Sequence, residues 1–369
     1  MNTDTYQYRL LELTAVSGEF PADLLSRIGP GVSYGEKMIT RLKDERLIRT
    51  HYRDRLRGYR LTASGKRLLL QQNPERFSFY LTGSSDTNQP RSEAPRRLRL
   101  HQTARTCQLI LAAGIELFRD RKPLLFQSRA SPAARALPFP VYYQSREIKE
   151  LGMETVKVNN SRTMGVLLTV DAVYVVYYTG NCAMKWSYQT EIKLKAILQH
   201  HISQGVLSGF YRTGTEIHAV MIGSDMDTAS VLMTSTGGYH KCCFSLDTSY
   251  SSFHFVPDTT AGESLLRLLA FPEILLQLKA LLGSDLYQPD GEAYPFEHDA
   301  IDRSGIPVLY ACDFDMQRIS RFVAALRLRQ LNGQILCFDF QKEAVLRYGK
   351  DVVEVHTIDL DKFKRRFFK

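Results

Sequence analysis

The 369-residue chain lacks several motifs that would assign a function directly. It contains no G-x-x-x-x-G-K-[ST] phosphate loop, which argues against an ATPase, and no glycine-rich dinucleotide loop follows a predicted strand. Its six cysteines include no C-x-x-C pair, so a structural zinc site is not expected. No His-hydrophobe-His triad accompanies a tyrosine, so relaxase chemistry based on a His-bound metal and a Tyr nucleophile is not indicated.

Signals for membranes and export are also missing. The longest apolar stretch, residues 165–184, is interrupted by Asp171 and rich in Val and Tyr, which predicts buried strands and not a bilayer span. The first residues lack a basic region followed by an apolar core, so no secretory signal is predicted. We therefore expect a cytoplasmic protein with no membrane partner.

The positive charge of the chain is concentrated near its start. The whole sequence has 48 Lys and Arg against 39 Asp and Glu, a net charge of +9. Residues 1–105 hold 19 basic and 11 acidic residues, a net +8, which leaves +1 for the remainder. A local excess of this kind predicts phosphate binding, because each Lys or Arg placed on a phosphate releases counterions.

A winged-helix pattern accounts for roughly the first 75 residues. Helices are expected at residues 5–16, 21–28 and 33–47. Two short strands follow at 48–51 and 59–61 around a basic tip, and a closing helix runs from residue 61 onward. Ser33 and Glu36 have the spacing of a capping box at the start of the third helix. The run Tyr59-Arg60-Leu61-Thr62-x-x-Gly65-Lys66 resembles the winged-helix superfamily.

This pattern predicts where DNA is contacted. In a winged helix the third helix enters the major groove and the wing lies along phosphates or the minor groove. The predicted contacts are Tyr34, Lys37, Thr40 and Arg41 on the third helix and Arg53, Arg55 and Arg57 at the wing tip. The alternative is a winged helix used for protein contacts, with these charges only solvated.

The rest of the chain predicts an α/β fold with a central mixed sheet. Residues 79–95 are predicted to be a linker, and a long helix is expected at residues 96–118. Strands are expected at residues 166–178, 183–188, 218–222, 231–234, 253–256, 307–312 and 334–339, and helices at 191–204, 262–282 and 316–331. The predicted domains are a winged helix at 1–78, a linker at 79–95, a nuclease-like α/β domain at 96–205 and an α/β region at 206–369.

Part of this pattern is typical of a metal-dependent nuclease. Such a core needs an Asp at the end of one strand and acid-x-Lys on the next, so that the acids hold Mg²⁺ and the Lys positions water. Asp171 ends the first predicted strand, but the second has Lys185-Trp186-Ser187 where an acid is required. The sequence therefore favours a non-catalytic scaffold without a bound cofactor, and an active Mg²⁺ nuclease using Asp171, Glu191 and Lys193 is the alternative.

Short motifs between residues 5 and 200 resemble the replication-relaxation proteins of plasmids and integrative conjugative elements. The motifs are Leu100-His101-Gln102-Thr103-Ala104, residues 142–149, Ser161-Arg162-Thr163-Met164-Gly165, Val170-Asp171-Ala172 and Thr190-Glu191. The resemblance implies an N-terminal winged helix-turn-helix and a restriction-endonuclease-like fold for the middle domain. Lys185 and Ser187 depart from the acidic positions of that pattern, which puts nicking activity in doubt more than the fold.

Three hypotheses follow. The first is a DNA-binding accessory protein that acts in replication, DNA relaxation or transfer of a mobile genetic element, with duplex DNA and a relaxase or other transfer proteins as partners. The second is the Mg²⁺-dependent nickase. The third is a winged-helix transcription regulator whose α/β half binds a ligand or forms a homodimer, which requires a pocket with convergent polar groups within residues 120–369.

Overall fold

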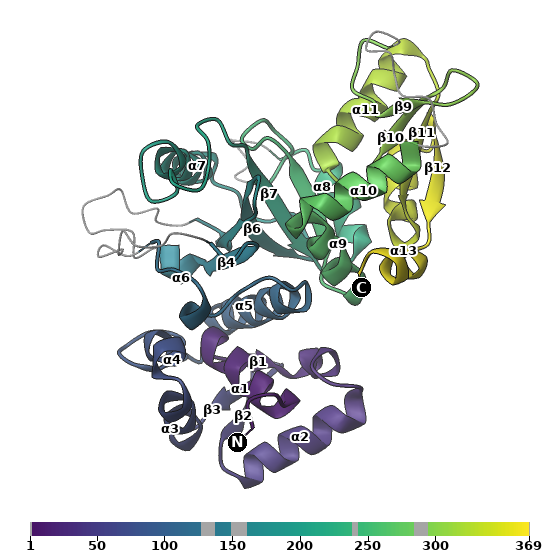
Figure 1. The fold of residues 1–369 in the computed structure, drawn as a ribbon. Coiled ribbons are helices and arrows are strands. Elements are labelled where there is room, and N and C mark those ends of the chain that lie inside the picture. The colour runs from purple at the N-terminus through teal and green to yellow at the C-terminus, as the bar shows by residue number, and fades with distance from the viewer. Residues whose placement is uncertain (1, 127–136, 149–160, 238–242, 284–293, 369) are drawn as a thin grey trace. The chain divides into compact units, whose positions relative to one another are not determined.

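The computed structural model describes residues 2–126, 137–148, 161–237, 243–283 and 294–368. The chain forms two compact units. Unit 1 consists of residues 1–112 and 117–123, and unit 2 of residues 113–116 and 124–369. The expected mixed α/β class is confirmed, because helices and sheets occur in both units (Figure 1).

Unit 1 is a group of helices around a small antiparallel sheet. Its elements are α1 (Tyr6–Ser17), β1 (Phe20–Pro21), the 3-10 helix η1 (Ala22–Arg27), α2 (Val32–Asp44), β2 (Ile48–Arg53), β3 (Leu56–Leu61), α3 (Ala63–Gln72), α4 (Pro74–Leu81), α5 (Ala94–Ala112) and the 3-10 helix η2 (Arg119–Arg121). The sheet has the order β1-β3-β2, and both of its strand pairs are antiparallel. Phe20 lies opposite Tyr59, and Ile48 opposite Leu61. These four buried side chains join the sheet to the core.

Local sequence explains most helix boundaries in unit 1. Thr5 begins α1, where its hydroxyl accepts a hydrogen bond from the Tyr8 amide, and Gly18 ends it with a left-handed φ of 82°. The expected capping box of Ser33 and Glu36 is wrong. Gly31 takes the N-cap position of α2, so Ser33 already lies inside the helix. The second expected helix is the 3-10 helix η1.

Residues 79–95 are not a free linker. Arg60 donates hydrogen bonds to the carbonyls of Pro90 (2.9 Å) and Arg91 (2.8 Å), and Lys66 donates to the side chain of Asn88 (2.7 Å). The following helix α5 belongs to unit 1 and ends at Ala112, before the expected end at residue 118. The first compact unit therefore extends well beyond the boundary expected at residue 78, because this polar segment binds the buried Arg60 of the sheet and the half-buried Lys66 of α3.

Unit 2 contains two sheets. The first has the order β4-β5-β6-β7-β8, in which β4, β5 and β6 are antiparallel and β6, β7 and β8 are parallel (Figure 1). Its elements are β4 (Val141–Gln144), α6 (Ser145–Ile148), β5 (Thr163–Leu168), β6 (Val173–Gly180), α7 (Tyr188–Ser203), β7 (Ile217–Gly223), α8 (Met226–Met233), β8 (Phe253–Pro257), α9 (Thr260–Ala270) and α10 (Pro272–Gly283). The mixed sheet expected from the sequence is therefore present.

The second sheet of unit 2 has the order β12-β11-β10-β9. Strands β10, β11 and β12 are parallel, and β9 pairs antiparallel with β10. Its elements are β9 (Ala300–Ile301), β10 (Pro307–Tyr310), α11 (Met316–Arg329), β11 (Gly333–Phe338), the 3-10 helix η4 (Asp339–Gln341), α12 (Lys342–Gly349), β12 (Val353–Ile358) and α13 (Leu360–Phe367). None of the described helices is long and apolar enough to cross a membrane.

Several expected elements of unit 2 are wrong. Residues 166–178 form the hairpin β5–β6 instead of one strand, with Val166 opposite Val175. Residues 183–188 make only an isolated bridge at Lys185, and their Trp186 is 1% exposed and packs on Tyr177 and Phe244. Residues 231–234 fall at the end of α8. Pro272 divides the helix expected at 262–282, since its ring removes a backbone donor.

Candidate nucleic-acid interface

Helix α2 exposes one polar face. Its apolar residues Met38, Ile39 and Leu42 are buried, with the spacing of a single helix face. The four predicted contact residues Tyr34, Lys37, Thr40 and Arg41 are all exposed. Arg41 forms an ion pair with Glu45 at 2.9 Å, but the two side chains are 66% and 40% exposed. Exposed pairs of this kind contribute little, so Arg41 can exchange its partner for a phosphate or a base.

The hairpin β2–β3 presents the predicted arginines at a tight turn. Asp54 and Arg55 connect the strands, and both have left-handed backbones, with φ of 53° and 60°. This is the two-residue type I′ geometry that matches the twist of a hairpin. Arg55 adopts it without being glycine, at a cost of roughly 1–3 kcal/mol. Arg53 and Arg57 flank the turn, and all three arginines are exposed.

Tyr52 belongs to the same surface and was missed by the sequence analysis. It lies opposite Arg57 in the hairpin and is 68% exposed. Side chains alternate between the two faces of a strand, so Ile48 and Tyr52 of β2 lie on the same face. Ile48 packs in the core, whereas Tyr52 lies beyond the end of the core and is therefore exposed. A large exposed aromatic side chain between arginines is suited to pack on a sugar or a base.

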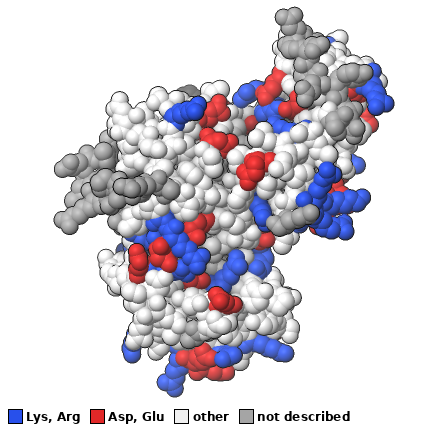
Figure 2. Space-filling view, in the orientation of Figure 1, with Lys and Arg blue, Asp and Glu red and all other residues white. Residues whose placement is uncertain are grey.

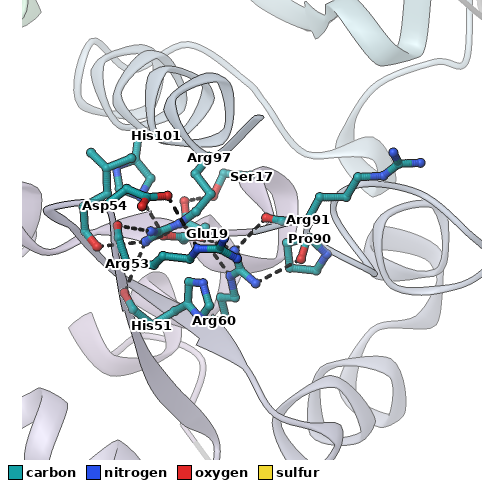
Figure 3. A network of polar contacts seen from close by, with 11 residues as sticks. Ser17, Glu19, His51, Arg53, Asp54, Arg60, Pro90, Arg91, Arg97 and His101 are labelled. Atoms are coloured by element: carbon teal, nitrogen blue, oxygen red, sulfur yellow. Dashed lines mark hydrogen bonds and ion pairs between the residues drawn. The ribbon is translucent and has the colours of Figure 1, made fainter. Parts of the chain in front are cut away.

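A buried carboxylate lies at the base of this hairpin (Figure 3). Glu19 is 0% exposed and accepts hydrogen bonds from Arg60 (2.8 Å), Arg97 (2.5 Å) and His101 (2.8 Å). Burial alone would raise the pKa of Glu19, but the hydrogen bonds from His101, Arg97 and Arg60 lower the pKa to about 2. Gly58 permits this approach, because a Cβ there would collide with the Glu19 carboxylate.

Arg97 of α5 also binds the hairpin backbone directly. Its guanidinium donates to the carbonyl oxygens of Arg53 (2.7 Å), His51 (3.2 Å) and Leu56 (3.1 Å), while also contacting Glu19 (Figure 3). A planar guanidinium with five fixed donors suits such convergent acceptors. The fully buried guanidinium of Arg97 therefore holds the backbone that carries the arginines at the tip. Local sequence patterns do not predict this role of Arg97, because Arg97 lies 44 residues from Arg53 in the sequence.

The charge of the chain divides between the two units. Unit 1 holds 22 Lys and Arg against 12 Asp and Glu, a net +10, whereas unit 2 holds 26 against 27, a net −1. Figure 2 shows Lys and Arg at the end of unit 1 where Figure 1 places α2, with a group of acidic side chains between them. The basic surface is therefore divided into clusters, which suits contacts to separate phosphates.

The three residues of the nuclease alternative lie in different environments. Asp171 is exposed in the turn between β5 and β6 and accepts a hydrogen bond from the Thr169 hydroxyl at 2.9 Å. Glu191 is 0% exposed in the first turn of α7. Lys193 is exposed on the same helix. Residues two apart on a helix face different directions, so Lys193 does not share the surroundings of Glu191.

The structure does not bring these residues together. Glu191 accepts hydrogen bonds from the Tyr177 hydroxyl (2.7 Å), the Ser161 hydroxyl (3.1 Å) and the Arg162 amide (3.2 Å), so both of its oxygens are occupied. Strand β6 begins just after Asp171, and from its first residue to Tyr177 it rises roughly 13 Å. Within the described ranges, no group of three His, Cys, Asp or Glu residues is arranged to hold a metal ion.

Comparison with known proteins gives no match to a protein-family model, a curated protein or a solved structure. The resemblance to replication-relaxation proteins therefore stays a prediction based on short motifs.

Proposed function

We propose that unit 1 is a winged helix that binds duplex DNA, with α2 in the major groove and the hairpin β2–β3 along the phosphates. The element order α1, β1, η1, α2, β2, β3 and the sheet order β1-β3-β2 support this proposal. The observation that carries it is the exposure of all seven predicted contact residues on two consecutive elements. The net charge of +10 on this unit supplies the attraction to phosphates.

We further propose that the chain is a non-catalytic accessory protein for replication, relaxation or transfer of a mobile genetic element. Three motifs of the resemblance support a shared scaffold, because they meet in unit 2. Glu191 bonds Ser161 and Arg162, and Gln144 pairs with Gly165 at the edge of the sheet. These motif residues stabilise packing. The sequential mixed sheet supports a restriction-endonuclease-like domain, whose contribution would then be to contact a relaxase or another transfer protein.

The decisive experiment removes the three tip arginines and follows DNA binding as a function of salt. Replacing Arg53, Arg55 and Arg57 by Ala should weaken binding and reduce the slope of log K against log salt by about one unit per lost phosphate contact. A matched control removes three exposed cations of unit 2, Arg303, Lys342 and Lys350, and should leave the slope unchanged. Fluorescence anisotropy with a labelled duplex at several salt concentrations measures both.

Equal affinity and slope for the wild type and the arginine variant would mean that the hairpin does not touch DNA. Unit 1 would then be a protein-contact module. For the wider role, relaxase and conjugation genes beside this gene support the mobile-element proposal. A neighbourhood without them favours the winged-helix transcription regulator.

A further inference from the structure

Unit 2 contains a polar cavity that the DNA-binding proposal does not use. It has a volume of about 430 Å³ and is lined by residues at the N-terminal ends of β6, β7 and β8, by α9 and α10, and by the segment that leads into α11. One wall is apolar, with Leu268 and Leu275. An apolar wall facing a few convergent polar groups is the usual composition of a small-molecule site.

A chain of hydrogen bonds sets the chemistry of the polar wall. His254 Nδ1 lies 3.1 Å from the Asp313 carbonyl oxygen, His254 Nε2 lies 2.8 Å from Ser252 Oγ, and Ser252 Oγ lies 2.7 Å from His218 Nδ1. A carbonyl only accepts, so His254 donates from Nδ1, and a neutral His254 ring then accepts the Ser252 proton at Nε2. The serine oxygen then accepts from His218 Nδ1. This leaves Nε2 of a neutral His218 as an acceptor, with Glu216 Oε2 3.6 Å away as a neighbouring acceptor.

His218 is neutral at physiological pH for a physical reason. Burial, together with the neighbouring His254, lowers the pKa of His218 to about 3. Its ring also packs near that of Tyr174, with centroids 5.1 Å apart. The polar wall therefore offers an uncharged acceptor beside an aromatic ring.

Asp313 adds a second acceptor. It is 6% exposed and lines the cavity, yet its Oδ1 atom is buried with no hydrogen-bond partner among the residues that the structure describes. Burying a carboxylate oxygen without a donor is costly, so such an atom requires a partner. A ligand that donates a hydrogen bond would supply it.

The charge of the cavity selects the ligand further. Its three basic residues are already paired: Arg318 with Asp299 (2.9 Å) and Glu297 (2.5 Å), Lys279 with Asp299 (3.9 Å) and Arg321 with Glu297 (3.9 Å). Three further carboxylates line it without a Lys or Arg partner in the described parts of the chain, namely Asp171, Glu216 and Asp315, and a fourth, Asp313, interacts electrostatically with Arg318 without an ion-pair contact. The cavity is therefore acidic overall and rejects anions.

We propose that this cavity binds a small organic cation whose protonated nitrogen donates to Asp313 and to His218 Nε2. The carbon skeleton of the ligand packs against Leu268 and Leu275, and the ring of Tyr174 adds a cation–π contact. The volume fits an aliphatic diamine or a guanidinium compound. Such a ligand makes unit 2 a sensor domain, and the inference is independent of DNA binding by unit 1.

Isothermal titration calorimetry of the full chain with putrescine and with agmatine tests the proposal, and 1,4-butanediol is the uncharged counterpart of putrescine. We expect saturable binding of at least one of the two amines, at one site per chain, and none of the diol. Asp313→Asn should weaken that binding at least tenfold, because it replaces the charged acceptor at nearly constant volume. Asp227→Asn makes the same change at an exposed site outside the cavity and should bind like the wild type.

A second variant keeps the test independent of any folding defect of Asp313→Asn. His218→Phe removes the Nε2 acceptor but retains an aromatic ring, and it should also weaken amine binding, with thermal unfolding recorded beside it. The proposal is overturned if neither amine binds, if the diol binds as tightly as putrescine, or if both variants bind like the wild type. Saturable binding of Mg²⁺ that competes with the amines and is lost in Asp313→Asn would also overturn it, in favour of a metal site.

Discussion

Arg97 offers the sharpest test of how unit 1 supports its proposed DNA-binding hairpin. Replacing Arg97 by Met keeps most of the apolar stem and removes the guanidinium. The variant loses the hydrogen bonds to Glu19 and to the three hairpin carbonyls of His51, Arg53 and Leu56. The Arg97 side chain is fully buried, although the turn whose backbone it contacts is exposed.

The size of the effect follows from burial. Removing one partner of a buried ion pair typically costs about 3–5 kcal/mol, because the other charge is left without compensation. Arg60 and His101 still contact Glu19 in the variant, which reduces this loss. The freed carbonyls add about 0.5–1.5 kcal/mol each, less where water reaches them. We therefore expect a loss of about 3–5 kcal/mol in the free energy of unfolding of unit 1.

Urea denaturation followed by far-ultraviolet circular dichroism measures this loss, together with hydrogen exchange at residues 48–61. The only tryptophan, Trp186, is buried in unit 2, so its fluorescence reports that unit separately and should be unchanged. Arg96→Met is the matched control on the same helix. The Arg96 side chain is 52% exposed and lies 3.5 Å from Asp86, so its loss should cost under about 1 kcal/mol. An Arg97 variant within about 1 kcal/mol of wild type, with unchanged hairpin exchange, would show that the Arg97 guanidinium does not hold the hairpin in place.

Two further predictions concern acid stability and cleavage. The pKa of Glu19 is lowered from 4.5 to about 2 in the folded chain, so its contribution is fully present above about pH 4.5 and is lost as the pH falls toward 2. This difference corresponds to roughly 3 kcal/mol, and urea titrations between pH 6 and 2.5 should show that loss in the wild type but not in Glu19→Gln. Supercoiled plasmid incubated with the full chain and Mg²⁺ should stay intact on an agarose gel, because Asp171, Glu191 and Lys193 do not converge. Nicking that disappears in Asp171→Ala would restore the nuclease hypothesis.

Local patterns predicted elements well where neighbouring residues decide the structure. The helix expected at residues 316–331 is α11 (Met316–Arg329), which Asp315 caps by accepting a hydrogen bond from the Gln317 amide. The strands expected at residues 218–222 and 253–256 are β7 and β8. The basic tip lies in a two-residue turn between paired strands. In each case a periodic apolar pattern or a capping residue contains the information.

Predictions failed where a distant partner decides the conformation. Residues 183–188 have the composition of a strand, but Trp186 fills a space beside Tyr177 and Phe244 and leaves the segment irregular. Residues 79–95 have the composition of a linker, but Arg60 and Lys66 bind their polar groups. Composition indicates the conformation that a segment favours in isolation, whereas contacts with distant residues determine the conformation of these two segments.

Composition and short spacing are enough to predict the charge asymmetry, the mixed α/β class, and the helix and hairpin that expose the predicted DNA contacts. The support behind those contacts depends on the fold, since Arg97 reaches carbonyls 41 to 46 residues away and Glu19 lies 78 residues from Arg97. The acidic cavity of unit 2 likewise joins Asp171, His218 and Asp313 from separate segments. Such sites depend on the fold because a buried charge is costly without a partner, and in the folded chain that partner can come from a distant segment.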